Sequence, residues 1–439
     1  MIPAPKGGEW AMSETIEVAA EGTPDQWKPA PAAPGDRIDS LDFIRGFAVM
    51  GILLANIVAF GQPFAAYMYP AAFAVPHGPA DDWLWVAQFV LVDGKMRGLF
   101  TLLFGAGLML FMEKAWANGA TRWLQARRLF WLALFGLAHF YLLWRGDILF
   151  LYAVAGSVAL LCLQWEAKTQ LAIGLLGYLA GAIFYASAMM SPYMIAETDL
   201  GEQIQFTETR QELAATRTGE LADAQTEIAV ITDGSYADYL RHTAEEHGSQ
   251  PFAALFFFLF ETLPLMLIGM ALFRYGLLDG SGDRKRIALW AVVGMVAGTA
   301  PTVPIALWAH AQGLTYWGTL AAFMGLAPLP RLPVVIGLAL LLALWGAGAR
   351  GWLAGRVRAA GRAAFSNYLG TSLLMLFVFH GWAGGLFAEL TRAQLYLVVL
   401  MTWVAMLAWS KPWLDRFRYG PLEWLWRCLT YGRLFPLRR

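Results

Sequence analysis

The sequence has 439 residues, of which 58% are hydrophobic and only 15% are charged, and its mean hydropathy is +0.50. Because soluble globular proteins carry about 25% charged residues, this composition excludes an ordinary soluble domain and indicates a polytopic membrane protein. No Walker loop, Rossmann fingerprint or Cys/His metal spacing is present, so we predict no metal site.

The first 36 residues contain no apolar core followed by a small-residue cleavage site, so they are not a secretory signal peptide. Their Pro, Ala and Glu content predicts a mostly disordered cytoplasmic tail. The hydrophobic segment that follows is therefore expected to remain in the protein as the first transmembrane helix.

Charged residues stand at the entrance of this first helix, where charge is costly and usually has a function. They are Asp39, Asp42 and Arg45, and Asn56 lies further along. On a helix, Arg45 and Asn56 differ by only about 20° in direction and by about 16 Å in height. One face would then carry polar groups toward the bilayer midplane, although Asp42 and Arg45 could also be a snorkelling pair that fixes helix insertion.

Ten apolar segments are long enough, or nearly so, to span a hydrocarbon core of about 30 Å. They lie at residues 43–61, 98–113, 129–144, 148–163, 170–189, 252–273, 287–308, 333–347, 364–382 and 394–410. The segment at 83–92 is shorter and is expected at the outer interface or partway into the membrane. Gly, Pro and polar residues near 309–331 leave the start of the eighth span open.

The distribution of Lys and Arg predicts the orientation of these spans. With the N-terminus inside, the inner segments hold 24 of the 32 basic residues. Both termini are therefore expected in the cytoplasm, and the fold class is an all-α, multi-pass membrane protein with about ten transmembrane helices.

A second charged group precedes the second span on the outer side, where positive charge is scarce. Asp93, Lys95 and Arg97 converge on a Gly-flanked turn at a helix start. Together with the partial positive charge of the helix N-terminus, the two cations could bind an anionic headgroup. The alternative is an interfacial anchor of the helix.

The outer link between spans three and four carries His139, Arg145 and Asp147. His139 lies about 8 Å inside the outer end of its helix and is the best-placed imidazole for acid–base chemistry near neutral pH. It could equally be a neutral His hydrogen-bonded between helices. Arg145 and Asp147 could pair with each other to close the turn.

Glu261 lies in an apolar span, about 14 Å from its outer end. An intramembrane carboxyl group is by default a functional-site hypothesis. The alternative is a protonated carboxyl group that bonds to a neighbouring helix.

Residues 191–250 hold twelve acidic residues against three Arg and predict one or two polar helices outside the membrane. We favour a solvated acidic cap over a ligand site, and an acidic segment is not expected to bind nucleic acid. Later in the chain, Asn367 opens the ninth span and resembles a polar plug or helix start. The tail at 411–439 is amphipathic and predicts an interfacial helix that anchors the chain or binds lipid or a partner.

These motifs resemble the YeiB-like inner-membrane proteins of bacteria, which carry the domain of unknown function 418. The likeness rests on Asp42-x-x-Arg45-Gly46, on 361–368 (GRAAFSNY) and most specifically on 418–427 (RYGPLEWLWR). It implies a bacterial inner-membrane location and five parts: a tail at 1–36, an acyltransferase-like bundle at 37–190, the loop at 191–250, a domain-418 bundle at 251–410 and the tail at 411–439.

The front half also resembles the transmembrane acyltransferase superfamily. In the bacterial O-acyltransferases a catalytic His stands eleven residues after the Arg of helix one, and here that position holds Asn56. Lysosomal heparan-α-glucosaminide N-acetyltransferase is similar in helix one, also has Asn there, and has its working His in the following loop. The resemblance therefore implies His77 as a rival of His139.

Two functions follow, and a third possibility is a lipid-binding scaffold that stabilises a partner. The first is an acyl-handling enzyme, with acyl-CoA as a possible donor near Arg45, a lipid or envelope glycan as acceptor near the outer cluster, and His139 or Glu261 as the base. The second is a transporter or flippase that moves a lipid or small amphiphile past Arg45, Asn56 and Glu261 without covalent chemistry. Membrane lipids are expected partners, and a homodimer is the default oligomer.

Overall fold

The computed structural model describes residues 38–76, 78–280 and 282–439, and within these ranges the chain forms α-helices and short helical turns without a β-strand. The expected all-α class is confirmed. The predicted disorder of residues 1–36 and the rival site at His77 lie outside the described residues.

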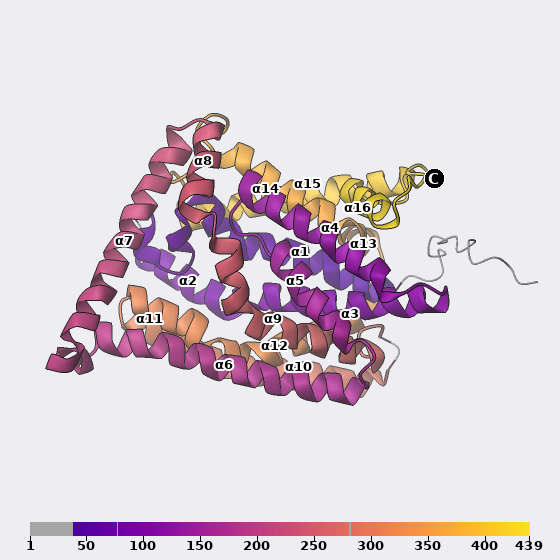
Figure 1. The fold of residues 1–439 in the computed structure, drawn as a ribbon, viewed down its shortest axis with the longest axis horizontal. Helices are drawn as coiled ribbons and strands as arrows, with labels where there is room; N and C mark the ends of the chain where they lie inside the picture. The colour runs from indigo at the N-terminus through magenta and orange to yellow at the C-terminus, as the bar shows by residue number, and fades with distance from the viewer. Residues whose placement is uncertain (1–37, 77, 281) are drawn as a thin grey trace, which may run out of the picture.

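Helix α1 (Asp39–Gly61) lies at the centre of the molecule (Figure 1). It packs against α3 (Lys95–Ala117), α12 (Pro328–Gly348), α13 (Trp352–Arg362), α14 (Ala364–Phe379) and α15 (Arg392–Arg416). At the crossing with α13, a Cβ on Gly361 would overlap the carbonyl oxygen of Asp42. Glycine is needed here because any side chain would push the two helices apart.

Within the described ranges, seven helical segments are long and apolar enough to cross a membrane. They are α1, the continuous segment Pro79–Ala117 that contains α2 (Pro79–Leu91) and α3, α6 (Ala167–Glu197), α9 (Gln250–Arg274), α10 (Arg284–Ala311), α12 and α15.

The other three predicted spans also coincide with helices: α4 (Arg122–Leu142), α5 (Leu149–Ala159) and α14. They are not among the seven long apolar segments, for different reasons. Helix α4 carries three Arg in its first two turns, whereas α5 and α14 are shorter than a full crossing.

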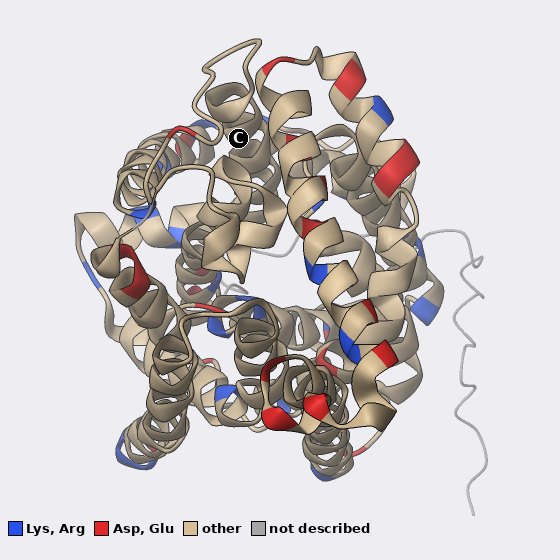
Figure 2. Ribbon diagram, turned by 90° about the vertical axis from the view of Figure 1, so that its left-hand side faces the viewer, with Lys and Arg blue, Asp and Glu red and all other residues tan. Residues whose placement is uncertain are grey.

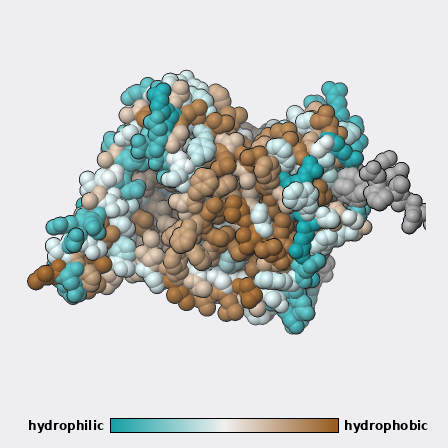
Figure 3. Space-filling model, in the orientation of Figure 1, coloured by the Kyte–Doolittle hydropathy of each residue, from teal (hydrophilic) through white to brown (hydrophobic). Residues whose placement is uncertain are grey.

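The surface supports a membrane location. Figure 3 shows a broad hydrophobic area between two hydrophilic ends. Helices α6 and α10 run along one side of the molecule (Figure 1), and they expose Leu176, Ile183, Val292 and Val296. Apolar side chains exposed in a continuous band are stable when they face lipid. The chain is therefore a membrane protein.

Two stretches that the sequence left open have irregular backbones. Helices α2 and α3 meet at Gly94, whose φ of +70° favours glycine. Between α10 and α12 the chain forms the short helix α11 (Tyr316–Leu320) and a π-helical turn, Ala321–Leu326. The span therefore begins at Pro328, a few residues before its predicted start.

The two ends of the molecule differ in character. As predicted, most of the acidic segment forms polar helices, α7 (Thr207–Thr232) and α8 (Tyr236–His247), which lie together at one end (Figure 1). Figure 2 looks onto this end and shows acidic residues along the helices that face the viewer. The predicted amphipathic tail helix is α16 (Pro421–Tyr431), and it lies near the opposite end, close to the C-terminus.

Candidate functional site

A cavity of about 860 Å³ lies among α1, α3, α4, α5, α14 and the C-terminal segment. Its wall follows α3 from Phe100 past the last turn to Asn118, which corresponds to about 27 Å of helix. The walls between these points are largely apolar, with Phe104, Leu108 and Leu132 among them. The cavity is thus long enough for an extended acyl chain.

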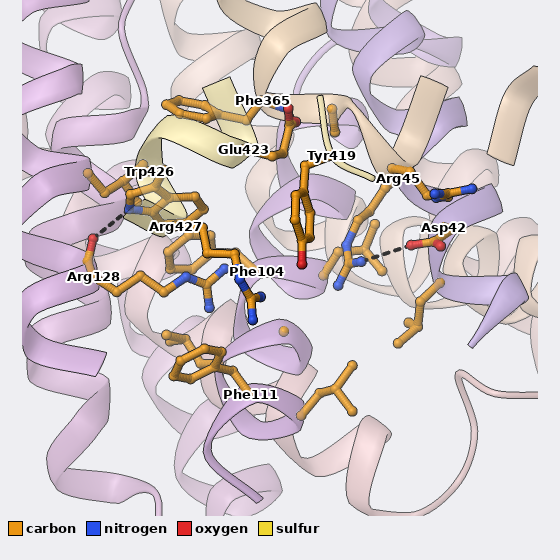
Figure 4. Close-up of a pocket in the computed structure, with 18 of the residues that line it drawn as sticks. Asp42, Arg45, Phe104, Phe111, Arg128, Phe365, Tyr419, Glu423, Trp426 and Arg427 are labelled. Carbon is orange, nitrogen blue, oxygen red and sulfur yellow. Dashed lines mark hydrogen bonds and ion pairs between the residues drawn. The ribbon is translucent and has the colours of Figure 1, made fainter. Parts of the chain in front are cut away.

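The end of the cavity near α16 is strongly cationic. Two carboxylates in the wall, Asp42 and Glu423, are outnumbered by six cations: Arg45, Lys114, Arg128, Arg362, Arg418 and Arg427. Figure 4 shows the guanidinium groups of Arg45, Arg128 and Arg427 directed into the same space. A surplus of positive charge beside an apolar chamber favours an amphiphile with an anionic headgroup.

Aromatic rings hold two of these cations in place. The Cζ atom of Arg128 lies 4.2 Å from the ring centroid of Trp426, and that of Arg427 lies 4.7 Å from the ring centroid of Phe435. Among the described residues, the buried Nε of Arg427 has no hydrogen-bond partner. Ring stacking fixes the guanidinium planes while leaving N–H groups for an anion.

Arg45 is half-buried and makes an ion pair with Asp42, with Nη1 3.2 Å from Oδ1. The predicted i, i+3 pair is therefore present, and both residues line the cavity. This placement fits either alternative, since a snorkelling pair and a ligand contact use the same position. The observation that favours a functional role is that both residues line the cavity.

Two tyrosines, Tyr152 on α5 and Tyr368 on α14, line the part of the cavity farthest from the cationic end. The Tyr152 hydroxyl lies 2.6 Å from Thr101 Oγ1 and 3.2 Å from the carbonyl oxygen of Arg97. The Tyr368 ring packs on the His139 ring, with 5.1 Å between centroids. Tyr152 thus separates the cavity from Glu261, and Tyr368 separates it from His139.

Behind Tyr368, the structure brings His139 and Asp147 together. His139 Nδ1 lies 2.8 Å from Asp147 Oδ1, and its Nε2 lies 2.8 Å from the hydroxyl of Ser372. The other carboxylate oxygen of Asp147 accepts a hydrogen bond from the Phe150 amide in the first turn of α5. His139 is buried and does not itself line the cavity.

Behind Tyr152, Glu261 on α9 is paired with two arginines. Arg97 Nη2 lies 2.5 Å from one carboxylate oxygen, and Arg331 Nη1 lies 3.0 Å from the other. Two guanidinium groups on one carboxylate stabilise its charged form, so this geometry favours an ionised Glu261 over the protonated alternative. Glu261 and His139 are in separate clusters, and neither lines the cavity.

The structure does not gather Asp93, Lys95 and Arg97 around an open space. Lys95 is buried and donates to the carbonyl oxygen of Phe89 at 2.5 Å, whereas Asp93 accepts from Gln88 at 3.0 Å. Arg97 turns instead toward Glu261. Their side chains therefore hold the α2–α3 junction together, which is the anchoring alternative.

Arg145 and Asp147 do not pair with each other. Arg145 Nη2 lies 2.8 Å from Glu227 on α7, and its Nη1 lies 2.5 Å from His247 Nε2 on α8. Burial, together with Arg145, lowers the pKa of His247 to about 4, so the ring is neutral at neutral pH. Arg145 therefore ties the membrane bundle to the acidic cap.

One group of potential metal ligands occurs in the described part of the chain. Ligand atoms of Asp223, His242 and His247 lie within 4.8 Å of one another. The Nε2 of His247 that faces Asp223 is already bonded to Arg145, whose charge repels a cation. This group therefore does not make a convincing metal site.

The two predicted asparagines lie outside the cavity wall. Asn56 is half-buried, and its amide makes no hydrogen bond within the described ranges. Asn367 donates to Ala360 O at 3.0 Å and accepts from Trp409 at 2.9 Å. Asn367 therefore ties α14 to α13 and α15, as expected of a polar plug.

Several residues of these clusters were not singled out from the sequence. The sequence placed Arg128 and Arg427 among the basic residues of the inner segments and Arg331 among the few basic residues of the outer segments, and it predicted no other role for them. Ser372 lies 233 positions from its partner His139, and nothing in its local sequence marks it. Its role becomes visible only when α4 and α14 are packed together.

The fold and the cavity define a class: a polytopic, all-α membrane protein with a cavity that is lined by several cations. Residues 272–433 match the family described as "Protein of unknown function (DUF418)". The chain is 32% identical to the uncharacterized protein YeiB of Escherichia coli (strain K12) over 424 residues, which are 91% of this chain and 98% of that protein.

A second relative, the uncharacterized protein YxaH of Bacillus subtilis (strain 168), is 28% identical over 93% of this chain and 98% of its own length. No solved structure matches the chain. The chain therefore belongs to the YeiB-like DUF418 family, as the sequence motifs indicated.

Proposed function

We propose that the protein is an acyl-handling enzyme of the bacterial inner membrane, and that the cavity binds an acyl donor with an anionic headgroup, such as acyl-CoA. The observation that carries this proposal is the combination of six cations at one end with a long apolar chamber behind them. An acyl-CoA has the matching form, because its phosphates are anionic and its acyl chain is apolar.

The distribution of charge supports an orientation for this reaction. The cationic end of the cavity lies with the loops that hold most Lys and Arg, so this end faces the cytoplasm, where acyl-CoA is available. The acidic cap of α7 and α8 then faces outward. Both termini lie on the cytoplasmic side in this arrangement.

His139 is the general base in this proposal. Its Nδ1–H donates to Asp147, which leaves Nε2 unprotonated and able to take a proton. A hydroxyl on a lipid or envelope glycan would approach from the outer side and be acylated. Asn56 has no part in proton transfer, because an amide cannot act as a base at neutral pH.

An acyl-transfer assay tests the role of His139 directly. Purified protein in nanodiscs, supplied with labelled acyl-CoA and an envelope-lipid extract, is expected to acylate an acceptor. His139→Ala should lower the rate by about 10²–10⁴-fold while leaving acyl-CoA binding unchanged. Full activity in this variant would remove His139 from the mechanism.

Binding tests the cavity separately. Arg128→Gln combined with Arg427→Gln should weaken palmitoyl-CoA binding by at least about tenfold, because each lost charge-assisted bond is worth about 1.5–3 kcal/mol. Arg286→Gln is the matched control, since Arg286 is exposed at the start of α10 and outside the cavity. Equal loss in the control, or no loss in the double variant, would contradict the proposed site.

The cluster of Arg97, Glu261 and Arg331 favours a second candidate, the transporter or flippase. A buried ion cluster that joins α3, α9 and α12 could exchange partners as helices move. Lipid flux into vesicles, divided by the amount of folded protein, should then fall strongly in Glu261→Gln. Unchanged flux would exclude Glu261 as a gate.

A further inference from the structure

We propose that Ser372 is the nucleophile of a Ser372–His139–Asp147 triad and that acyl transfer passes through an acyl-serine intermediate. This inference rests on the proposed acyl-handling function and adds a covalent step to it. The three side chains come from α14, α4 and the turn before α5, and they meet in one place only because of the tertiary fold.

The geometry assigns each member a role. Asp147 fixes the Nδ1–H tautomer of His139, so Nε2 presents a lone pair to the Ser372 hydroxyl at 2.8 Å. Asp147 is itself held by the Phe150 amide. The arrangement is a nucleophile bonded to a base, with the base oriented by a third group.

The Ser372 hydroxyl makes its shorter contact with His139 and its longer one with its own helix. Helical serines commonly donate to the carbonyl four residues earlier, and Ser410 and Ser157 do so at 2.7 and 2.8 Å. For Ser372 the corresponding distance to Tyr368 O is 3.5 Å. The shorter distance, 2.8 Å to His139 Nε2, makes His139 the closer partner of this hydroxyl.

Tyr368 controls access from the cavity. It precedes Ser372 by four residues, so the two lie on the same face of α14, and its ring covers His139. Ser372 is only 2% exposed, whereas Tyr368 lines the cavity. A rotation of the Tyr368 ring would admit the acyl carbonyl to the triad and still exclude bulk water, which would otherwise hydrolyse the ester.

The reaction balances without a redox partner. The Ser372 oxygen bonds to the carbonyl carbon of the thioester while His139 Nε2 takes the hydroxyl proton. The carbon–sulfur bond then breaks, and the thiol leaves with that proton. In the second half, the acceptor hydroxyl gives its proton to His139, its oxygen forms the new ester bond, and Ser372 regains the proton as its ester bond breaks.

The test is covalent labelling of the full chain in nanodiscs of phosphatidylethanolamine and phosphatidylglycerol with hexadecyl fluorophosphonate. Its phosphorus is attacked by an activated serine with loss of fluoride. Peptide mass mapping of the wild type should locate the adduct on Ser372. The adduct should be absent in Ser372→Ala and retained in Ser410→Ala, a serine that is equally buried but has no hydrogen bond to a histidine.

Asp147→Asn tests whether Asp147 orients His139 or only stabilises the local turn. The Asn side chain keeps an oxygen that can accept a hydrogen bond from the Phe150 amide, so the turn should be preserved. Labelling should slow by roughly 10²–10⁴-fold, as expected when the tautomer is no longer fixed. Tyr368→Ala should speed labelling if the ring covers the triad. A wild type and a Tyr368→Ala variant that both show no adduct on Ser372 would overturn the proposal.

Transfer assays distinguish this proposal from the function on which it rests. If Ser372→Ala still transfers acyl groups at the wild-type rate, the acyl-serine step is wrong and direct transfer through His139 stands. If the wild type neither binds palmitoyl-CoA nor transfers an acyl group, the acyl-handling function itself is wrong. An adduct on Ser372 together with loss of transfer in Ser372→Ala supports both.

Discussion

At the scale of single residues, Glu261 makes ion pairs with Arg97 and Arg331 from two other helices. Its carboxylate is almost fully buried, and so is the guanidinium of Arg331. A buried carboxylate with two cationic partners holds helices together. Removing it leaves two guanidinium charges without their partner, which is destabilising.

Neutralising Glu261 should therefore destabilise the protein. Glu261→Gln leaves two buried guanidinium groups facing an uncharged amide, and breaking a buried pair in this way costs about 3–5 kcal/mol. Unfolding in mixed micelles should show this loss, with Glu208→Gln on the exposed face of α7 as the unaffected control. Equal stability of the two variants would show that the cluster contributes little.

At the scale of elements, the C-terminal helix α16 forms part of the cavity wall and is fastened to the start of α14. The Glu423 carboxylate accepts from the amides of Phe365 and Ser366 at 2.8 and 3.1 Å, and from the Ser366 hydroxyl at 2.5 Å. Burial raises the pKa of Glu423 above its ordinary value of 4.5.

This shift makes the docking of α16 depend on pH. Between pH 4.5 and the raised pKa, the carboxyl group of Glu423 is protonated when α16 is docked and ionised when α16 is undocked. Docking of α16 therefore weakens as the pH rises through that range. Alkylation of the buried Cys428 in a Cys162→Ala background reports undocking. Its rate, divided by that of Glu423→Gln, should increase with pH.

The amide of Glu423→Gln can still accept from both backbone N–H groups and donate to Ser366, so this variant should stay docked at every pH. Dividing by its rate also removes the ordinary pH dependence of thiol reactivity. A ratio that is constant with pH would show that Glu423 does not control α16.

The sequence was sufficient for most of the helices, but it did not predict α13 or the contacts between helices. Apolar runs and charged loops are local features, so the apolar helices, the polar helices α7 and α8 and the amphipathic α16 were predictable. Glu261 and Arg97 are 164 positions apart, and which face of each helix meets which neighbour is not written in either segment. For this reason Asp93 and Lys95 looked like an open binding site, yet both are buried.

At the scale of the whole molecule, the cationic end of the cavity lies near α16 and the acidic cap lies at the opposite end (Figure 1). In the proposed function, a donor enters from the cationic side and an acceptor from the side of the acidic cap, and this is its central claim.

A cryo-electron microscopy structure of the protein in nanodiscs with a non-hydrolysable palmitoyl-CoA analogue tests that claim most directly. We expect the phosphates beside Arg45, Arg128 and Arg427, the pantetheine arm along α3, and the thioester carbonyl group next to Tyr368. A saturating analogue that binds elsewhere, or a cavity that stays closed to it, would contradict the account.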